Sequence, residues 1–181
     1  MQTIVFTLRF DRDSERAVRA IRERVNAAGI KLPGVTVHRP HITVAAYDVE
    51  DVDANISALT GAIRTVPPFE LGLDYLGVFP ERRVAFLAPR PIPELRSLHQ
   101  RIVDHFSGPD FPPMKWELLL PGRWVPHCTI AADLSPTDLT KVIDICHRSW
   151  TPVSGRVEAV GVLLPPAVED SCEVRLRGDE V

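Results

Sequence analysis

The segment RPHITVAAYD at residues 39–48 has a close relative in VPHCTIAADL at residues 125–134. Both contain Pro-His-x-Thr-x-Ala-Ala, and the two histidines, His41 and His127, lie 86 positions apart. The composition of this chain would give about 0.03 copies of Pro-His-x-Thr, so chance explains two copies poorly. We therefore expect an internal duplication centred on these two segments.

The pattern of expected helices and strands repeats along the chain in the same way. A strand at 3–10 comes first, and each half then continues as helix, strand, helix, strand, strand. In the first half these elements are expected at 11–29, 41–47, 50–65, 69–79 and 82–88, and in the second half at 91–106, 127–132, 135–146, 155–163 and 172–177. The tripeptide LPG also precedes both motif segments, at 32–34 and at 120–122. The repeat thus extends over roughly 11–88 and 91–178.

Local signals predict where the helices begin and which sides they bury. Asp13 or Ser14 is expected to cap the first helix, which should end at Gly29. Ser135 should cap the fourth helix. Its inward-facing residues are expected to be Leu139, Val142, Ile143 and Cys146, and those of the third helix Leu95, Leu98, Ile102 and Phe106.

These elements predict an α+β fold. We expect two pseudo-symmetric lobes of antiparallel sheet with flanking helices around a central cleft, forming a single domain over residues 1–181. The chain has 181 residues, of which 45% are hydrophobic and 25% charged, as in an ordinary globular protein. We expect it to be monomeric.

Composition also limits the partners and the cellular compartment. The net charge of -3 gives no general basic field that would hold long nucleic acid, although a small or terminal phosphate remains a possible ligand. The three cysteines are widely spaced, which argues against a disulfide framework or a thiolate zinc site. The N-terminus alternates like a strand, and no segment has the pattern of a signal peptide or a membrane span. We expect a cytoplasmic protein that needs no membrane and no cofactor.

The two motif segments are expected to present polar side chains on one face of a strand. Side chains alternate along a strand, so the two residues of His-x-Thr share a face and the residue between them points the other way. His41 with Thr43, and His127 with Thr129, should therefore line the open face. Ile42, Val44, Cys128 and Ile130 should lie in the core, which makes Cys128 a packing residue and not a nucleophile.

A pair of histidines suits general acid-base chemistry on a phosphodiester. An imidazole titrates near neutral pH, so a neutral ring can take a proton from the attacking oxygen while a charged ring gives one to the leaving oxygen. Threonine hydroxyls beside them can donate to non-bridging phosphate oxygens. This scheme requires no metal, and the chain lacks clustered ligand spacings such as HExxH. The alternative is that the duplication copied two strand motifs that have a structural role and no catalytic one.

The twin motifs, their separation and the two-lobe repeat resemble the 2H phosphoesterase superfamily, and within it the 2'-5' RNA ligase / cyclic phosphodiesterase group. HITV and HCTI both satisfy the family pattern of His-x-Thr/Ser followed by an apolar residue. The resemblance implies that His41 and His127 are the catalytic pair and that Thr43 and Thr129 bind phosphate. It also implies a substrate with a cyclic phosphate, at an RNA end or on a nucleotide, or the joining of RNA ends through a 2'-5' bond.

Residues near the motifs could add contacts to such a substrate. Arg39 precedes the first motif, and Arg123 and Trp124 precede the second, so they are candidates to hold a terminal phosphate or stack a base. Lys115 and Trp116 lie in the same loop. The remaining histidines are interpreted as structural or solvated: His38 in a loop, His99 at a helix boundary, and His105 and His147 at the surface. Scattered arginines at 82, 83, 90, 96 and 101 could form a basic lip for RNA or simply be solvated.

Taken together, the residues favour a metal-independent phosphodiesterase that hydrolyses a 2',3'-cyclic phosphate. His127 is assigned as the base and His41 as the acid, although the pseudo-symmetry allows the reverse. Two alternatives stay open. One is 2'-5' RNA ligase activity, which the acidic net charge does not favour. The other is a nucleotide- or RNA-binding module that uses the same cleft without catalysis.

Overall fold

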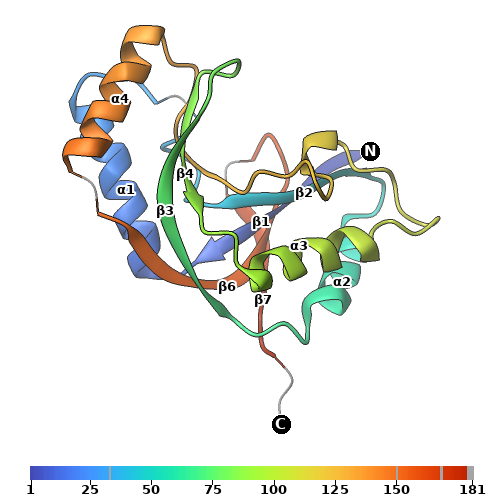
Figure 1. The fold of residues 1–181 in the computed structure, drawn as a ribbon. Coiled ribbons are helices and arrows are strands. Elements are labelled where there is room, and N and C mark those ends of the chain that lie inside the picture. Colours follow the sequence, from blue (N-terminus) through green and yellow to red (C-terminus); the bar gives the residue numbers. More distant parts are fainter. Residues whose placement is uncertain (33, 150, 168, 179–181) are drawn as a thin grey trace.

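The computed structural model describes residues 1–32, 34–149, 151–167 and 169–178. Its helices and strands follow the expected order, with a short 3₁₀ helix added before the second motif (Figure 1). The elements are β1 (Gln2–Phe10), α1 (Arg12–Ala27), β2 (Ile42–Val49), α2 (Val52–Ile63), β3 (Phe69–Phe79), β4 (Val84–Pro89), α3 (Pro93–His105), η1 (Glu117–Leu119), β5 (Cys128–Ala131), α4 (Pro136–Arg148), β6 (Val153–Leu163) and β7 (Asp170–Arg175). The predicted elements are therefore present, with ends shifted by a few residues. Of the predicted LPG repeat, Pro33 lies outside the described residues.

The strands form one antiparallel sheet, which confirms the α+β class. Within the described residues the sheet has seven strands in the order β2-β1-β6-β3-β4-β5, and β7 pairs with β6 beside this path. All neighbouring strands run antiparallel. The two lobes are thus halves of a continuous sheet, joined where β3 meets β6.

The junction between the lobes has twofold character. Residues 69–73 of β3 pair with residues 153–157 of β6, and Leu71 lies opposite Gly155. The 86-residue offset maps 69–73 onto 155–159, which overlaps the paired segment 153–157 with a shift of two residues, so β3 pairs with its own repeat, as strands do across a twofold axis. Outward from the junction, β4 and β5 on one side take the places of β1 and β2 on the other. The pseudo-symmetry places the motif strands β2 and β5 at equivalent positions.

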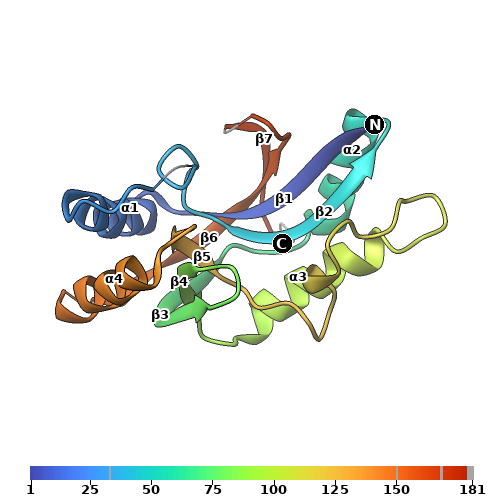
Figure 2. The ribbon, with the colours of Figure 1, turned by 90° about the horizontal axis from the view of Figure 1, so that it is seen from above.

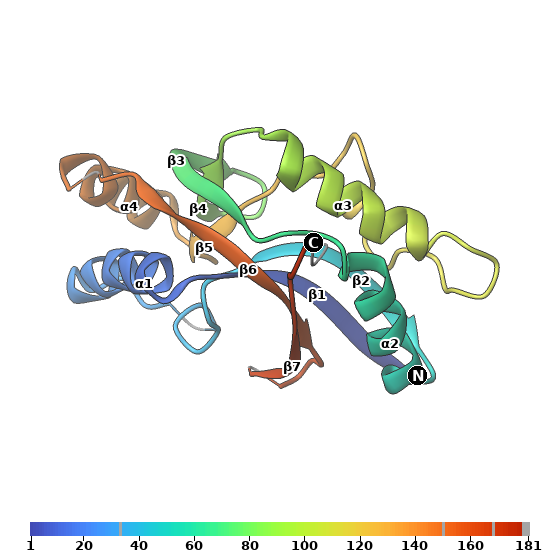
Figure 3. The ribbon, with the colours of Figure 1, turned by 90° about the horizontal axis from the view of Figure 1, so that it is seen from below.

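The helices pack in two pairs that the same pseudo-symmetry exchanges. Helix α1 contacts α4, and α2 contacts α3. Two turned views show the first pair at one end of the molecule and the second pair at the other (Figure 2, Figure 3). The chain therefore does not keep each repeat in its own lobe, because each helix pair takes one helix from each half of the sequence.

Helix boundaries and buried sides follow the sequence with two exceptions. Helix α1 is capped by Asp11, whose carboxylate accepts from the backbone amides of Asp13 and Ser14, so the prediction of a cap at 13 or 14 was wrong. In α4, Ser135 is the N-cap as predicted, but Ile143 is 39% exposed. Val142 and Cys146 fill the buried side of that helix, and Ile143 lies beyond the edge of the stripe. The predicted stripe of α3 is fully buried.

The turn and loop signals act as predicted. Gly29 adopts a φ of 85°, the left-handed conformation that ends a helix, directly after the C-cap of α1. The hairpin of β3 and β4 turns through residues 80–83, where Arg83 has a φ of 50°. No helix in the described ranges is both long enough and apolar enough to cross a bilayer.

Candidate active site

The motif strands separate polar from apolar residues as strand alternation requires. Ile42 and Val44 of β2 have no exposed surface, and neither do Cys128 and Ile130 of β5. The histidine and threonine of each motif are half-buried, on the opposite face of their strand. The core positions predicted from the sequence are therefore confirmed.

Both motif histidines are held by the same local hydrogen bond. The Nδ1 atom of His41 lies 2.7 Å from the carbonyl oxygen of Arg39, and that of His127 lies 2.7 Å from the carbonyl oxygen of Val125. A carbonyl oxygen can only accept, so Nδ1 must carry the proton in each ring. In the neutral imidazole, Nε2 then has a free lone pair, and in the charged form it becomes a donor. Each ring thus presents Nε2 as its reactive atom.

A buried arginine that the sequence analysis did not single out ties the two motif segments together. Arg22 on α1 is 4% exposed. Its Nη2 donates to the carbonyl of Thr129 at 2.8 Å, and its Nη1 donates to the carbonyls of Val35 at 3.0 Å and His38 at 2.9 Å. One guanidinium therefore bridges the second motif and the loop before the first. In the sequence it looked like one of several arginines on an amphipathic helix, so only its tertiary partners reveal it.

The backbones of the two motif strands also approach each other. Residues of β2 and β5 have Cα atoms within 8 Å although the strands do not pair. The backbone amide of His41 lies near the buried thiol of Cys128. Burial raises the pKa of that thiol, while Arg22 and this amide oppose the rise, so Cys128 stays protonated as a core residue.

The segment before the second motif is fastened to the first motif by Trp124. Its Nε1 donates to the carbonyl of Thr43 at 2.9 Å, and its ring stacks on His99 with centroids 3.9 Å apart. His99 is 3% exposed and its Nε2 lies 2.8 Å from the carbonyl of Leu119, so it is a core residue and not the helix-boundary residue that was predicted. The indole N–H is therefore occupied by the protein backbone.

The two catalytic candidates differ in their surroundings. Burial is the main reason that the pKa of each ring lies below its ordinary value. For His41, burial and the positive charges of Arg9 and Arg22 lower the pKa to about 3. For His127 the charged neighbour that lowers the pKa is Arg82. Both rings are therefore neutral at pH 7 in the free protein.

A cavity opens beside the second motif. It has a volume of about 390 Å³, and its walls include Phe79, Arg82, Arg123, His127 and Thr129. Phe79 meets the His127 ring edge-on with centroids 4.9 Å apart, and its ring packs on a second aromatic, Phe86. The predicted residue Arg123 is thus brought together with the second motif, where it also pairs with the exposed Glu117 at 2.7 Å. The aromatic wall can stack against a flat ring of a ligand, and the two arginines can bind a negatively charged group attached to it.

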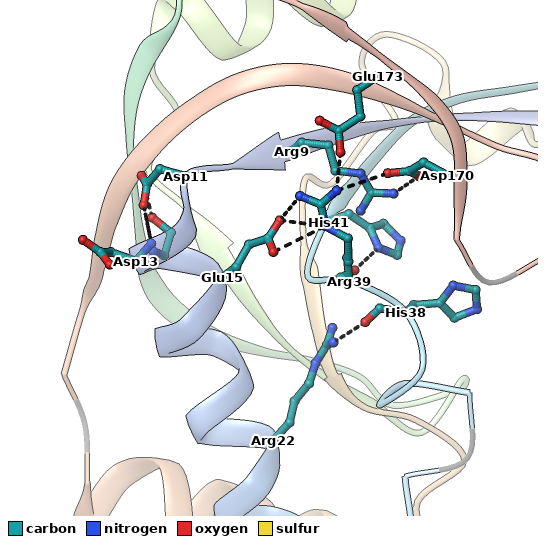
Figure 4. Close-up of polar contacts among 11 residues, drawn as sticks. Arg9, Asp11, Asp13, Glu15, Arg22, His38, Arg39, His41, Asp170 and Glu173 are labelled. Atoms are coloured by element: carbon teal, nitrogen blue, oxygen red, sulfur yellow. Dashed lines mark hydrogen bonds and ion pairs between the residues drawn. The ribbon is translucent and has the colours of Figure 1, made fainter.

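Arg39 is directed into a cluster of carboxylates (Figure 4). Its guanidinium bonds to Glu15 at 2.6 Å and to Glu173, and it lies 3.7 Å from Asp170. The bonds to Glu15 raise the pKa of Arg39 above its ordinary value. Its side chain is therefore engaged by the protein, while its carbonyl oxygen orients the His41 ring.

The other residues of the two loops have structural partners or lie at the surface. Lys115 pairs with Asp48 at 2.6 Å, and Trp116 is 40% exposed. His105 and His147 are exposed, as predicted, and His38 is half-buried with its ring 6.2 Å from that of His41. Among the described residues, no three His, Cys, Asp or Glu side chains gather as ligands for a metal ion.

Comparisons with known proteins agree with this fold. The family model of the 2'-5' RNA ligase superfamily matches residues 10–165. TT0787 of Thermus thermophilus superposes with a TM-score of 0.62 at 18% identity, covering 98% of this chain and 100% of that one. LigT of E. coli in its apo form gives a TM-score of 0.59 at 18% identity, covering 93% and 90% of the two chains. LigT complexed with 3'-AMP gives 0.55 at 20% identity, covering 90% and 87%. A search among curated proteins finds no significant match.

Proposed function

The chain belongs to the 2'-5' RNA ligase superfamily, and from this premise we propose that it is a metal-independent phosphodiesterase that hydrolyses 2',3'-cyclic phosphates. The substrate is an RNA end or a small nucleotide. The observation that carries this proposal is the matched anchoring of His41 and His127, each with Nδ1 on the carbonyl two residues earlier and Nε2 available for proton transfer. Two rings prepared in the same way suit a reaction that needs one proton acceptor and one proton donor.

The proposed reaction is an attack of water on the cyclic phosphate. One neutral Nε2 takes a proton from water while the water oxygen forms a bond to phosphorus. The bond from phosphorus to one ribose oxygen breaks. The second histidine, which is charged, gives its Nε2 proton to that oxygen. Thr43 and Thr129 donate to the non-bridging oxygens, where negative charge builds up in the transition state. The product is a ribose phosphate monoester.

We assign His41 as the base and His127 as the acid, the reverse of the assignment made from the sequence. The acid must be charged when the substrate is bound, and Arg9 and Arg22 make protonation of His41 the more costly of the two. For His127 the cation that lowers the pKa is Arg82. An anionic substrate would raise the pKa of both rings, and we propose that His127, beside Arg82 and not beside Arg9 and Arg22, becomes the donor.

The cavity beside His127 supports a nucleoside as the organic part of the substrate. Its aromatic wall and its two arginines offer a stacking surface and positive charge next to Thr129. One similar structure, LigT of E. coli, is a complex with 3'-AMP, which is a nucleotide with a phosphate on the ribose. We place the nucleoside on this side, next to the ring that protonates the leaving ribose oxygen.

A second candidate is a nucleotide-binding module without catalysis. The lowered pKa values of both histidines favour it, because neither ring of the free protein is charged at pH 7. The superfamily name also points to a 2'-5' RNA ligase, which would use the same groups in the reverse direction.

The three cysteines are free, which fits the reducing cytoplasm that we expect for a monomeric protein acting on RNA ends or nucleotides.

A test with defined substrates separates these candidates. The protein is incubated in EDTA with 2',3'-cyclic AMP and with an oligoribonucleotide that ends in a 2',3'-cyclic phosphate, and the products are identified by phosphorus NMR. A single monoester isomer, formed at an undiminished rate in EDTA, supports the phosphodiesterase. Binding of the nucleotide without any product supports the module, and a new 2'-5' linkage after addition of a 5'-hydroxyl RNA supports the ligase.

A further inference from the structure

Arg9 lies on the strand next to the first motif, on the face that carries the motif's polar side chains. In the β1–β2 register, Thr7 is opposite Thr43 and Leu8 is opposite Ile42. Side chains two apart on a strand share a face, so Arg9 shares the face of Thr7 and lies one step further along, toward His41. In Figure 4 its guanidinium lies between the His41 ring and the carboxylate of Asp170.

The Arg9 side chain is buried but incompletely satisfied. It is 3% exposed, and it forms an ion pair with Asp170 through Nη2. Its Nε and Nη1 have no hydrogen-bond partner among the described residues. A buried donor without an acceptor is costly, and a guanidinium without one is more so. An acceptor that arrives with a ligand would remove this cost.

The surroundings hold the Arg9 side chain in this position. Gly161 on β6 lacks a side chain where the guanidinium passes, and a methyl group at that residue would lie 2.5 Å from Nε and 2.9 Å from a carboxylate oxygen of Asp170. Of the nearby acids, Glu15 and Glu173 bind Arg39, and Asp170 pairs with Arg9 through Oδ1, while its buried Oδ2 has no hydrogen-bond partner among the described residues. The orientation of Arg9 is thus fixed before any ligand binds.

We propose that Arg9 is a ligand for the substrate phosphate, donating from its unpaired Nη1 to a non-bridging oxygen of the group held by Thr43 beside His41. The identity of the anion rests on the proposed function, whereas the anion site itself rests on the buried donor. Phosphate oxygens are strong acceptors, and the guanidinium is the side chain that binds them best.

The site is asymmetric because the second lobe has no equivalent of this arginine. In β4, Phe86 is opposite Thr129 and Leu87 is opposite Cys128, so the position that corresponds to Arg9 is Ala88. The position that corresponds to Thr7 is Phe86, whose ring lies 5.2 Å from that of His127. One half of the duplicated site therefore has a buried cation beside its histidine and the other has an aromatic wall. This difference gives the bound phosphate a preferred side, toward β1.

Electrostatics agree with an anion at this point. Besides burial, the charges of Arg9 and Arg22 lower the pKa of His41. A phosphate beside Arg9 would offset these charges and raise the pKa of His41 from its low value, so the bound anion would make the neutral ring a stronger base.

The test measures binding of inorganic phosphate, which needs no turnover. Dissociation constants are obtained by NMR titration at fixed pH, with the His41 ring signals as the reporter, for the wild type, D170N and the double variant R9Q/D170N. D170N keeps the arginine and removes the negative charge of its partner, whereas the double variant removes the ion pair and leaves no unpaired buried carboxylate. R9K is a second probe, because it keeps the charge opposite Asp170 but not the planar fork.

The expected result is that D170N binds phosphate within about 2-fold of the wild type, while R9Q/D170N binds it at least about 10-fold more weakly and R9K is intermediate. Equal constants for the wild type, R9K and a folded R9Q/D170N would overturn the proposal. If the double variant does not fold, R9K alone decides. A protein that binds phosphate in this Arg9-dependent way but hydrolyses no cyclic phosphate would contradict the proposed function and leave this inference standing.

Discussion

The indole of Trp124 donates to the backbone carbonyl of Thr43 across 2.9 Å, so the segment that leads into the second motif is fixed to the first motif. The strands of the two motifs do not pair with each other, and such contacts set their relative position. Arg22 provides another, through the carbonyls of Thr129 and His38. The candidate site is therefore assembled by residues outside the motifs, and their removal should affect catalysis without touching a reacting group.

Replacing Trp124 by phenylalanine should separate the hydrogen bond from the ring stack. W124F keeps a ring on His99 and loses the donor to Thr43, so we expect a loss of about 1 kcal/mol of unfolding free energy. We also expect kcat to fall more than KM rises, because Thr43 would be less firmly oriented. Urea denaturation and steady-state kinetics measure both effects. W116F, at a position with 40% exposure, is the control, and an unchanged kcat in W124F would contradict the positioning role.

Replacing Arg22 by methionine should damage both stability and activity. R22M keeps the aliphatic stem but leaves the carbonyls of Thr129, Val35 and His38 without their donor. We expect a loss of roughly 3 kcal/mol in unfolding free energy and a drop in kcat of at least about 10-fold. R16M is the matched control, because the Arg16 side chain on the same helix is 78% exposed. Restoration of activity by added guanidinium would indicate positioning, and a fully active R22M would contradict it.

The assignment of acid and base can be tested through the leaving group. A substrate in which sulfur replaces the leaving ribose oxygen expels a thiolate that needs no proton from an acid. H127N should therefore regain most of its lost rate on this substrate, whereas H41N should not, because water must still be deprotonated. Rates with the oxygen and sulfur substrates are compared for each variant. Recovery in H41N instead would reverse the assignment.

The lowered pKa of His41 should make the fold sensitive to acid. The ring has a pKa of about 3 in the folded chain and about 6.5 when unfolded, so below pH 6.5 the unfolded state binds the additional proton. Stability should be independent of this group above pH 6.5 and should decline as the pH falls toward 3. Between pH 7 and pH 4, H41N should lose about 2 kcal/mol less than the wild type, since the half-exposed ring is partly screened. If thermal melts show that the wild type and H41N lose equal stability between pH 7 and pH 4, the lowered pKa of His41 in the folded chain would be contradicted.

The sequence was informative where the physical signal is local. Strand alternation predicted that Ile42 and Cys128 are buried while the histidines and threonines stay accessible, and Ser135 capped its helix as predicted. The 86-residue repeat predicted the pseudo-symmetric fold because both halves keep the same order of elements.

The sequence did not predict the features that depend on contacts formed only in the folded chain. The N-cap of α1 is Asp11 because its carboxylate accepts from the backbone amides of both Asp13 and Ser14. The sequence offers Asp11, Asp13 and Ser14 as residues of cap-forming type within four positions, so it does not distinguish among them. Arg22 and Arg9 resemble any other arginines until their burial and partners are seen. Arg39 lies next to the motif in sequence, yet distant carboxylates on α1 and β7 determine where it points.

The most direct test of the two-histidine scheme is turnover of 2',3'-cyclic AMP in EDTA by the wild type, H41N and H127N, each confirmed as folded by circular dichroism. Each histidine should supply on the order of 100- to 10,000-fold in rate. We therefore expect robust metal-free hydrolysis by the wild type and a loss within that range or beyond it in both variants. Hydrolysis that persists undiminished in H41N or in H127N, or that disappears from the wild type when metal is removed, would contradict the account.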